Sequence, residues 1–232
     1  MLDLKPRDIL IATVLLAGFA AAGAGLVALV QEGTEARIAD NRMEVNRSRI
    51  AELTGDLDYA NDPVHDTMAL SSDRLGGTDL PAWFARDADD NVMGIVFSAV
   101  ARDGYSGDIH LLIGVNRDGE LLGVRISSHR ETPGLGDAIE AERSDWIHGF
   151  EGRSLGDPEP GDWAVRRDGG VFDQFTGATI TPRAVVRAVR RTLEYFDDYR
   201  DDLLASAPGE DEGAMVEPIG KDSSMDTEQE AR

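Results

Sequence analysis

The apolar residues are unevenly distributed along the chain, and the longest uninterrupted apolar run lies close to the N-terminus. Residues 9–30 form a stretch of 22 residues without a charged side chain. As a helix this stretch would extend about 33 Å, which predicts a single transmembrane helix. Lys5 and Arg7 precede it, so the positive-inside rule predicts a cytoplasmic segment over residues 1–8 and an extracytoplasmic remainder. A cleaved signal peptide is the alternative, although the run is long for a signal and lacks a small-x-small cleavage site.

The next segment, residues 31–57, is charged and free of proline. Its apolar residues recur at loosely helical intervals, which predicts a linker helix from Thr34 to Leu57 that leaves the membrane. Residues 58–90 are mixed and rich in turn formers, and their pattern predicts no definite element. The pattern becomes clearer from Val92 onward, within a compact domain expected over residues 58–204.

Three stretches of apolar and β-branched residues follow one another with short connections. They predict strands over Val92–Val100, Ile109–Val115 and Leu121–Ser127. Asp118 and Gly119 lie between the last two, and an Asp-Gly pair supplies the positive φ that a tight hairpin turn needs. Consecutive hairpins that precede the helices favour an α+β fold, with a mostly antiparallel sheet and flanking helices, over a doubly wound parallel sheet.

Beyond the strands, the apolar period changes to that of a helix. Residues from Asp137 to Phe150 have helical spacing, and Trp163 to Arg166 is a candidate for a short strand. The clearest helix runs from Thr181 to Tyr199, with Thr181 as its expected cap and Pro182 in its first turn. One apolar stripe runs along this helix, and its arginines occupy the other faces.

The composition of the chain excludes several chemistries. There are 44 acidic and 23 basic residues, with a net charge of −21, which argues against a nucleic-acid-binding surface. There is no cysteine, so disulfides, thiolate nucleophiles and cysteine-ligated iron–sulfur clusters are excluded. The four histidines lack a close metal-ligand spacing, and no metal site is expected. Residues 205–232 are acidic and contain Pro, Gly and Ser, which predicts a disordered tail.

Two glycine-rich stretches are candidates for a ligand site. The first, from His129 to Asp137, contains a proline and two glycines, and exposed loops of this kind bring ligands to main-chain groups. The second, from Asp173 to Pro182, leads small and hydroxyl residues into the strong helix, whose N-terminus suits a phosphate. An ordinary strand-to-helix turn and an ordinary helix cap are the alternatives. No histidine lies near the threonines in sequence, so self-catalysed nucleophilic attack is not supported.

The second stretch resembles a known modification motif. Asp173 to Thr179 is similar to Asp-x-x-Ser/Thr-Gly-Ala-Thr/Ser, the flavinylation signature of the FMN-binding domain family. Over roughly residues 1–200, the order of further motifs resembles that of the G subunits of Rnf-type ion-translocating electron transport complexes. The C subunit of the sodium-translocating NADH:quinone reductase shares the signature, but the Glu-Thr-Pro-Gly-Leu-Gly context and the short chain favour the Rnf type. The matching motifs are Gly104–Gly107, Leu111–Gly114, Glu131–Gly136, Asp168–Gly170 and Phe172–Val186.

The resemblance implies a role for each matching position. Thr179 would carry FMN covalently through a phosphoester, attached by a separate flavin transferase that takes the FMN from FAD. The recognition motif around the phosphate would comprise Asp173, Thr176, Gly177 and Ala178. No catalytic residue is implied beyond the flavin. The residues expected against the flavin ring are Glu131, Thr132, Gly134, Leu135, Tyr105 and Ser106.

The same resemblance implies a function and a location. The protein would be one component of an ion-translocating oxidoreductase in the bacterial inner membrane, with a single span at residues 9–30 and an FMN-binding domain at residues 58–204 in the periplasm. It would relay electrons among other membrane and iron–sulfur subunits of the complex. Two further functions stay open: a stand-alone extracytoplasmic FMN-dependent reductase, and a non-redox binding module anchored in the membrane.

Overall fold

The computed structural model describes residues 6–206 of the 232-residue chain. Residues 1–5 and 207–232 lie outside the described residues, and so does most of the predicted disordered tail. Some side chains of the first helix, most of them between residues 29 and 46, lie outside the description as well. The chain divides into two compact units, Met1–Asn46 and Arg47–Arg232, and the domain limits proposed at residues 58 and 204 stay predictions.

The described part of the N-terminal unit is helical. Helix α1 runs without interruption over Pro6–Thr54, so one helix includes the predicted span at residues 9–30 and most of the predicted linker helix. Apolar side chains of its first half, among them Leu16 and Phe19, are exposed. Within the part of the chain that the structure describes, no helix combines the length and the apolarity needed to cross a membrane. The transmembrane segment therefore stays a prediction from the sequence.

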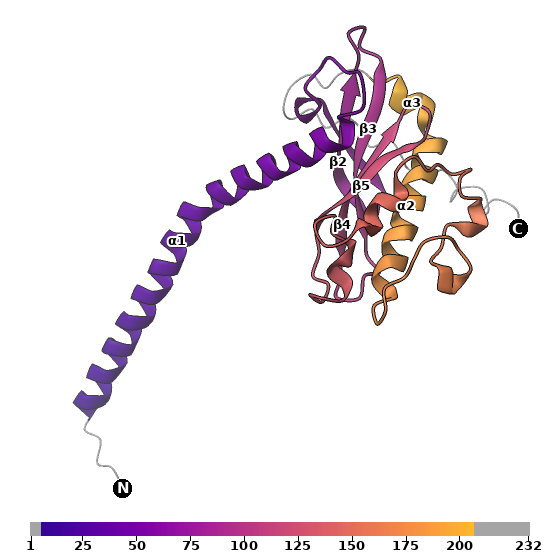
Figure 1. The fold of residues 1–232 in the computed structure, drawn as a ribbon. Coiled ribbons are helices and arrows are strands. Elements are labelled where there is room, and N and C mark those ends of the chain that lie inside the picture. The colour runs from indigo at the N-terminus through magenta and orange to yellow at the C-terminus, as the bar shows by residue number, and fades with distance from the viewer. Residues whose placement is uncertain (1–5, 207–232) are drawn as a thin grey trace, which may run out of the picture. The chain divides into compact units, whose positions relative to one another are not determined.

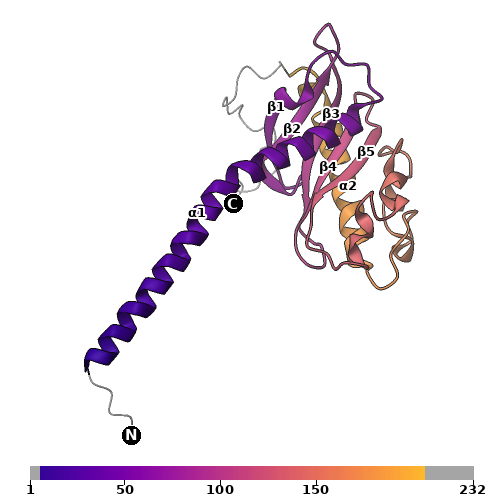
Figure 2. The same ribbon diagram turned by 60° about the vertical axis from the view of Figure 1, so that its left-hand side comes forward.

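A five-stranded antiparallel sheet forms the centre of the second unit (Figures 1 and 2). The strands pair in the order of the chain, β1-β2-β3-β4-β5, which confirms the predicted α+β fold with an antiparallel sheet. Each strand is connected to its neighbour by a turn or a short loop. The strands are Thr67–Ser72 (β1), Gly77–Arg86 (β2), Val92–Ala101 (β3), Ile109–Asn116 (β4) and Leu121–Ser128 (β5).

The sequence pattern predicted β3, β4 and β5 but not β1 and β2. β2 contains glycine, aspartate and proline, which are depleted in strands, and its first half is largely exposed; the short β1 has few β-branched or aromatic residues. Asp79 in β2 even has a positive φ of 53°. Pairing with β3 outweighs these weak local preferences, because Trp83 lies opposite Val96 and Phe84 lies opposite Ile95.

Helix α2, Ile180–Asp198, packs on one face of the sheet (Figure 1). Its buried residues share the main hydrophobic core with β3 and β4. Phe97 of β3 meets the rings of Tyr195 and Phe196 edge-on, with centroid distances of 6.2 and 6.3 Å. Helix α3, Arg200–Leu204, follows directly. The long apolar stripe predicted for the strong helix is therefore the surface that closes the main core.

The last turns of α1 pack on the opposite face of the sheet. Ile50 and Leu53 contact Trp83, Val96 and Leu112 in a second, smaller core. The sheet residues of this small core alternate along their strands with those that face α2, as the two-residue period of a strand requires. The end of α1 thus belongs to the same compact unit as the sheet.

Shortening a side chain in the smaller core should weaken the protein measurably. Ile50 is 1% exposed, and Ile50→Val removes one buried methyl group. We expect the free energy of unfolding to fall by about 1 kcal/mol, measured by urea denaturation. Ser48→Ala, at an exposed position of the same helix, is the matched control and should change the free energy by less than about 0.5 kcal/mol. Unchanged stability in Ile50→Val would contradict the packing of α1 on the sheet.

The helix predicted from Asp137 to Phe150 is wrong as a single element. The structure has two short 3-10 helices there, Gly136–Ile139 and Asp145–Phe150. The first ends at Glu140, whose backbone is extended with a ψ of 137°. Ser144, also extended with a φ of −160°, precedes the second. Its hydroxyl accepts a hydrogen bond from the N–H of Trp146 and so caps the second helix. The helical spacing of the apolar residues arises from two turns rather than from one continuous helix.

The short strand predicted at residues 163–166 is also wrong. Only a single bridge joins Val165 to Phe172, and the 3-10 helix Arg166–Asp168 follows it. The backbone turns away directly after this bridge, so no continuous strand pairing follows it. Two further 3-10 helices, Pro63–His65 and Pro160–Asp162, lie in loops of the same unit.

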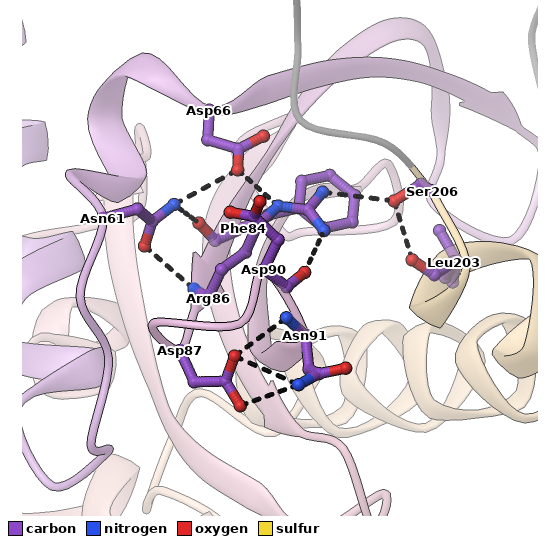
Figure 3. A network of polar contacts seen from close by, with 9 residues as sticks. All are labelled: Asn61, Asp66, Phe84, Arg86, Asp87, Asp90, Asn91, Leu203 and Ser206. Atoms are coloured by element: carbon purple, nitrogen blue, oxygen red, sulfur yellow. Dashed lines mark hydrogen bonds and ion pairs between the residues drawn. The ribbon is translucent and has the colours of Figure 1, made fainter.

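A buried ion pair joins the end of β2 to its surroundings (Figure 3). The Arg86 side chain is 2% exposed, and its Nε donates to Asp66 Oδ2 at 2.6 Å. Its Nη1 donates to the carbonyl of Asp90 at 3.2 Å, and its Nη2 lies 3.5 Å from the hydroxyl of Ser206. The Asn61 amide accepts from the N–H of Arg86 and donates to Asp66. One guanidinium therefore connects the approach to β1, the β2–β3 turn and the segment after α3.

Candidate functional site

Thr179 lies where the second glycine-rich stretch meets helix α2. It occupies the capping position before Ile180, it is half-buried, and its side chain makes no capping hydrogen bond. The cap predicted at Thr181 is wrong, because Thr181 lies inside the first turn and is fully buried. Pro182 is in the first turn, as expected. A threonine hydroxyl thus stands at the N-terminus of a 19-residue helix, where a phosphate is stabilised by the helix dipole.

A tight turn leads into α2. The N–H of Ala178 donates to the carbonyl of Phe175 at 3.2 Å. Gly177, within this turn, has a φ of +84°, a conformation that favours glycine over other residues. Thr176 and Gly177 are exposed, and Ala178 is half-buried. The small residues of the motif therefore have a structural reason, and they leave the backbone accessible.

The stretch before the turn is fixed by contacts with other loops. Trp146 Nε1 donates to the carbonyl of Asp173 at 2.8 Å, and the Trp146 ring meets the ring of Phe175 at a centroid distance of 5.2 Å. The side-chain oxygen of Gln174 accepts from the N–H of Arg167 at 3.2 Å. The turn thus has a defined position although much of it is exposed.

Glu131 connects the first glycine-rich stretch to α2. The residue is 4% exposed, its Oε1 accepts from the N–H of Ser106 at 2.9 Å, and its Oε2 accepts from the hydroxyl of Thr181. Glycines make room for it: a Cβ on Gly104 would lie 3.0 Å from Oε1, and a Cβ on Gly136 would lie 2.9 Å from the Glu131 Cβ. The carboxylate was predicted to lie against a flavin ring, whereas the structure buries it among protein groups.

The rest of the first stretch forms an exposed turn. The carbonyl of Thr132 accepts from the N–H groups of Leu135 and Gly136 at 3.1 and 3.0 Å, and Gly134 has a φ of +77°. Thr132, Gly134 and Leu135 are exposed. The Leu135 side chain reaches the second stretch, because its Cδ2 lies 3.7 Å from where a Cβ on Gly177 would be. The two glycine-rich stretches therefore lie side by side.

Exposed apolar side chains adjoin these loops. Within the described residues from Arg47 onward, the exposed large hydrophobic side chains are Tyr105 at 68%, Leu135 at 46% and Ile180 at 42%. Tyr105 precedes Ser106, and Ile180 precedes Thr181, the two residues that donate to Glu131. Leu135 lies in the loop that follows Glu131. Apolar surface concentrated at one place of an otherwise polar exterior is typical of a binding site.

His129 supports the first stretch from inside. Its Nδ1 accepts from the N–H of Glu131 at 3.0 Å, and its Nε2 lies 2.8 Å from Glu140 Oε1. Because Nδ1 accepts, the neutral ring carries its proton on Nε2 and donates it to the Glu140 carboxylate. The His129 side chain is 10% exposed, so its role in this site is to hold the loop.

Comparison with known proteins identifies the family. Residues 104–194 match the FMN-binding domain, and residues 1–53 match the RnfG N-terminal region. The G subunit of the ion-translocating oxidoreductase complex of Pseudomonas aeruginosa (strain UCBPP-PA14) is 50% identical over 207 residues, which cover 88% of this chain and 96% of that protein. The chain belongs to the RnfG family, the G subunits of ion-translocating oxidoreductase complexes.

Further relatives agree with this assignment. The corresponding G subunit of Cereibacter sphaeroides is 43% identical over 199 residues, covering 86% of this chain and 89% of that protein. The crystal structure of Shewanella oneidensis NqrC has 25% sequence identity, with coverage of 65% of this chain and 76% of that chain. The TM-score of this match is 0.44. The resemblance to Rnf-type G subunits that the motifs indicated is confirmed.

The family match coincides with the candidate site. The FMN-binding domain of this RnfG-family protein begins at residue 104 and ends at residue 194, so it contains Ser106, the first stretch from Glu131, the second stretch with Thr179, and most of α2. Strands β1, β2 and β3, which complete the sheet, precede the matched range. The site residues predicted from the motifs therefore lie on segments that the fold brings together, and their roles with FMN stay proposals.

Two residues of this RnfG-family site were assigned other roles by the sequence pattern. Thr181 was interpreted as a helix cap, and Trp146 only as part of the helical pattern of residues 137–150. Their hydrogen bonds to Glu131 and Asp173 join positions 50 and 27 residues apart along the chain. A local sequence pattern does not indicate contacts between residues so far apart in the chain. The available signal was the Thr181 hydroxyl itself, a polar group that needs a partner once the helix is buried.

The arginines of α2 near the site are paired with carboxylates. Arg187 pairs with Asp103 at 2.7 Å. The guanidinium of Arg183 donates to both oxygens of Asp168, at 2.5 and 2.8 Å, and these hydrogen bonds lower the pKa of Asp168 below its ordinary value. A depressed carboxyl pKa contributes stability above its unfolded-state value of about 3.9, and that contribution is lost as the pH falls through the folded pKa.

The Arg183–Asp168 ion pair should make the stability of the protein depend on pH. Wild type should be more stable than Asp168→Asn at neutral pH, and the difference should shrink as the pH falls below about 4. Urea unfolding of both proteins between about pH 7 and about pH 3 measures the difference. Asp108→Asn, at an exposed position, is the control and should change the free energy of unfolding at neutral pH by less than about 0.5 kcal/mol. A difference that grew towards acid would contradict the assigned pairing.

Proposed function

We propose that this protein carries FMN covalently on Thr179 and relays electrons within an ion-translocating oxidoreductase complex. The observation that carries the proposal is the position of Thr179 before a 19-residue helix, with a side chain that makes no capping hydrogen bond. The N–H groups and the dipole at a helix N-terminus stabilise a phosphate there. The match of residues 104–194 to the FMN-binding domain supports the same cofactor.

The surrounding residues fit such a group. The phosphate would be held at the turn of Thr176, Gly177 and Ala178, where small side chains leave the backbone accessible. The flavin ring would lie on the apolar surface that includes Leu135 and Tyr105, the former held by the turn that begins at Thr132. Bound FMN would accept and release electrons, and a chain without cysteine has no thiol pair that could do so instead.

Attachment of FMN would require an enzyme, and the loop suits one. Transfer of FMN from FAD forms an ester bond between the Thr179 oxygen and phosphorus, breaks the pyrophosphate bond and releases AMP. The hydroxyl proton has to go to a base that a flavin transferase provides. Asp173 and Thr176 of the recognition motif are exposed, while Trp146 and Phe175 hold the loop in one shape.

The location and the partners are part of the proposal. Residues 9–30 would anchor the chain in the inner membrane, supported by their lack of charge and by the match of residues 1–53 to the RnfG N-terminal region. The FMN-bearing unit would then face the periplasm. Related proteins are named as subunits of an ion-translocating complex, so other membrane subunits and iron–sulfur subunits are the expected partners. A covalent bond would keep the flavin on the protein in a compartment where FMN is not readily replaced.

Flavin fluorescence tests the proposal. The full-length protein is co-expressed with a flavin transferase, denatured, and viewed under ultraviolet light after gel electrophoresis. A fluorescent band at the position of the protein is expected, and a wild-type chain without flavin would refute the covalent carrier. Purification from membranes then separates the two redox functions, because a subunit of a complex brings other membrane proteins with it and a stand-alone reductase does not.

A further inference from the structure

We propose that Glu131 is a positioning residue that assembles the site around Thr179 through hydrogen-bond geometry, without contacting the cofactor. The inference rests on the proposed function for its link to FMN, but its structural content concerns the protein alone. It assigns to Glu131 a role different from the one that the resemblance implied, which was contact with the flavin ring.

The contacts of the carboxylate carry the inference. One oxygen accepts from the N–H of Ser106 at 2.9 Å, and the other accepts from the Thr181 hydroxyl. Both oxygens are thus used by protein donors, and the residue is 4% exposed. The three joined segments are far apart in the sequence: the Gly104–Gly107 loop, the loop after β5 and the first turn of α2. In the structure the carboxylate is thus directed to donors inside the protein, and little of it is exposed at the surface.

The close packing around Glu131 allows only one arrangement of the three segments that it joins. A Cβ on Gly136 would lie 3.0 Å from both Glu131 Oε2 and Thr181 Oγ1, and a Cβ on Gly104 would lie 2.2 Å from the carbonyl of Gly107. Side chains at either glycine would therefore push the joined segments apart. The glycines of these two motifs have a structural purpose here, which is to let the backbones approach the carboxylate.

The backbone of Glu131 is fixed independently of its side chain. Its N–H donates to His129 Nδ1 at 3.0 Å, and His129 Nε2 is bound to Glu140 at 2.8 Å. The start of the exposed turn is therefore held by His129, while the side chain holds the Ser106 and Thr181 segments against it. Thr179 precedes Thr181 by two residues, and Leu135 follows Glu131 in the same loop. The position of the Glu131 carboxylate therefore sets the distance between Thr179 and Leu135.

Conservative variants separate geometry from charge. In Glu131→Gln, the amide oxygen can accept from Ser106 and the amide nitrogen can donate to the Thr181 oxygen, so the connections survive without the charge. Glu131→Ala removes both connections. We expect the Ser106 amide of Glu131→Ala to exchange its hydrogen about tenfold faster or more. Glu131→Gln should recover most of the protection. Glu142→Ala, at an exposed position between the two 3-10 helices that follow this loop, should leave the exchange rate unchanged.

The same set of variants is then loaded with FMN by a flavin transferase. Glu131→Ala should incorporate FMN about tenfold more slowly, because the acceptor loop is no longer held in one geometry, and Glu131→Gln should restore most of the rate. Thr181→Val, which keeps the shape but removes the hydroxyl, should be slowed, and Thr181→Ser should be close to wild type. The double variant Glu131→Ala/Thr181→Val should be no slower than the worse single variant.

Each outcome decides the inference. Glu131→Ala with wild-type exchange at Ser106 would overturn it, and so would additive losses in the double variant. A Glu131→Gln protein as defective as Glu131→Ala would also overturn it, because the charge and not the geometry would then matter. A wild-type chain that takes up no FMN would refute the proposed function, and the hydrogen exchange of the unmodified protein would still test the role of Glu131.

Discussion

Thr179→Ala is expected to abolish covalent FMN completely while leaving the fold intact. The Thr179 hydroxyl oxygen is the atom that would carry the phosphoester, and an alanine side chain has no oxygen to take its place. The same hydroxyl makes no capping hydrogen bond, and its loss should change the free energy of unfolding by less than about 0.5 kcal/mol. In-gel fluorescence of the denatured protein and urea unfolding measure the two effects separately.

Two variants complete this experiment. Thr179→Ser retains a hydroxyl and should still be labelled. Thr78→Ala removes an exposed threonine from β2, away from the proposed motif, and should be labelled as wild type. A fluorescent band that persisted in Thr179→Ala would place the covalent link on another residue and would contradict the proposed attachment site.

The largest loss of stability is expected from breaking the buried ion pair at the end of β2. Asp66→Ala leaves the Arg86 guanidinium, 2% exposed, without the carboxylate to which it donates at 2.6 Å. An uncompensated buried charge costs about 3–5 kcal/mol. Urea denaturation should show a decrease of that size in the free energy of unfolding, with the folded protein still obtainable at low denaturant.

A double variant tests the cause of that loss. In Asp66→Ala/Arg86→Met the unpaired charge is gone and an apolar chain fills part of the space, so much of the lost stability should return. Asp89→Ala, an exposed aspartate in the following turn, should change stability by less than about 0.5 kcal/mol. If the double variant were less stable than Asp66→Ala, the unpaired guanidinium would not be the source of the effect.

The elements that could be predicted from the sequence are those whose local pattern agrees with their tertiary environment. Strands β3, β4 and β5 alternate or run apolar because both faces of the sheet are covered there, and the Asp118–Gly119 turn fixes the pairing of β4 with β5. Among residues 6–206, strand β1 pairs only with β2, and the first half of β2 is largely exposed, so their sequences need few apolar residues. The predicted helix from Asp137 failed because a backbone-capping serine, Ser144, interrupts an otherwise helical spacing.

The candidate site also has one part that could be predicted from the sequence and one part that could not. The motif around Thr179 and the turn at Leu135 could be recognised locally, because they consist of contiguous small and glycine residues. The contact between Glu131 and Thr181 could not, since the two positions are 50 residues apart. The function of a buried carboxylate depends on which donors the fold brings to it, and no single stretch of sequence contains that information.

The strand order has a consequence for the way the protein is made. Every strand pairs with its neighbour in the chain, so hairpins can form as soon as each strand leaves the ribosome or the export channel, starting from the N-terminal side. The second glycine-rich stretch and α2 follow all five strands, and α2 then packs on the main core. Thr179, the proposed acceptor, therefore reaches its final environment only after the five strands have been produced. Flavin attachment would in this way be restricted to finished chains, and the modification would report completed folding.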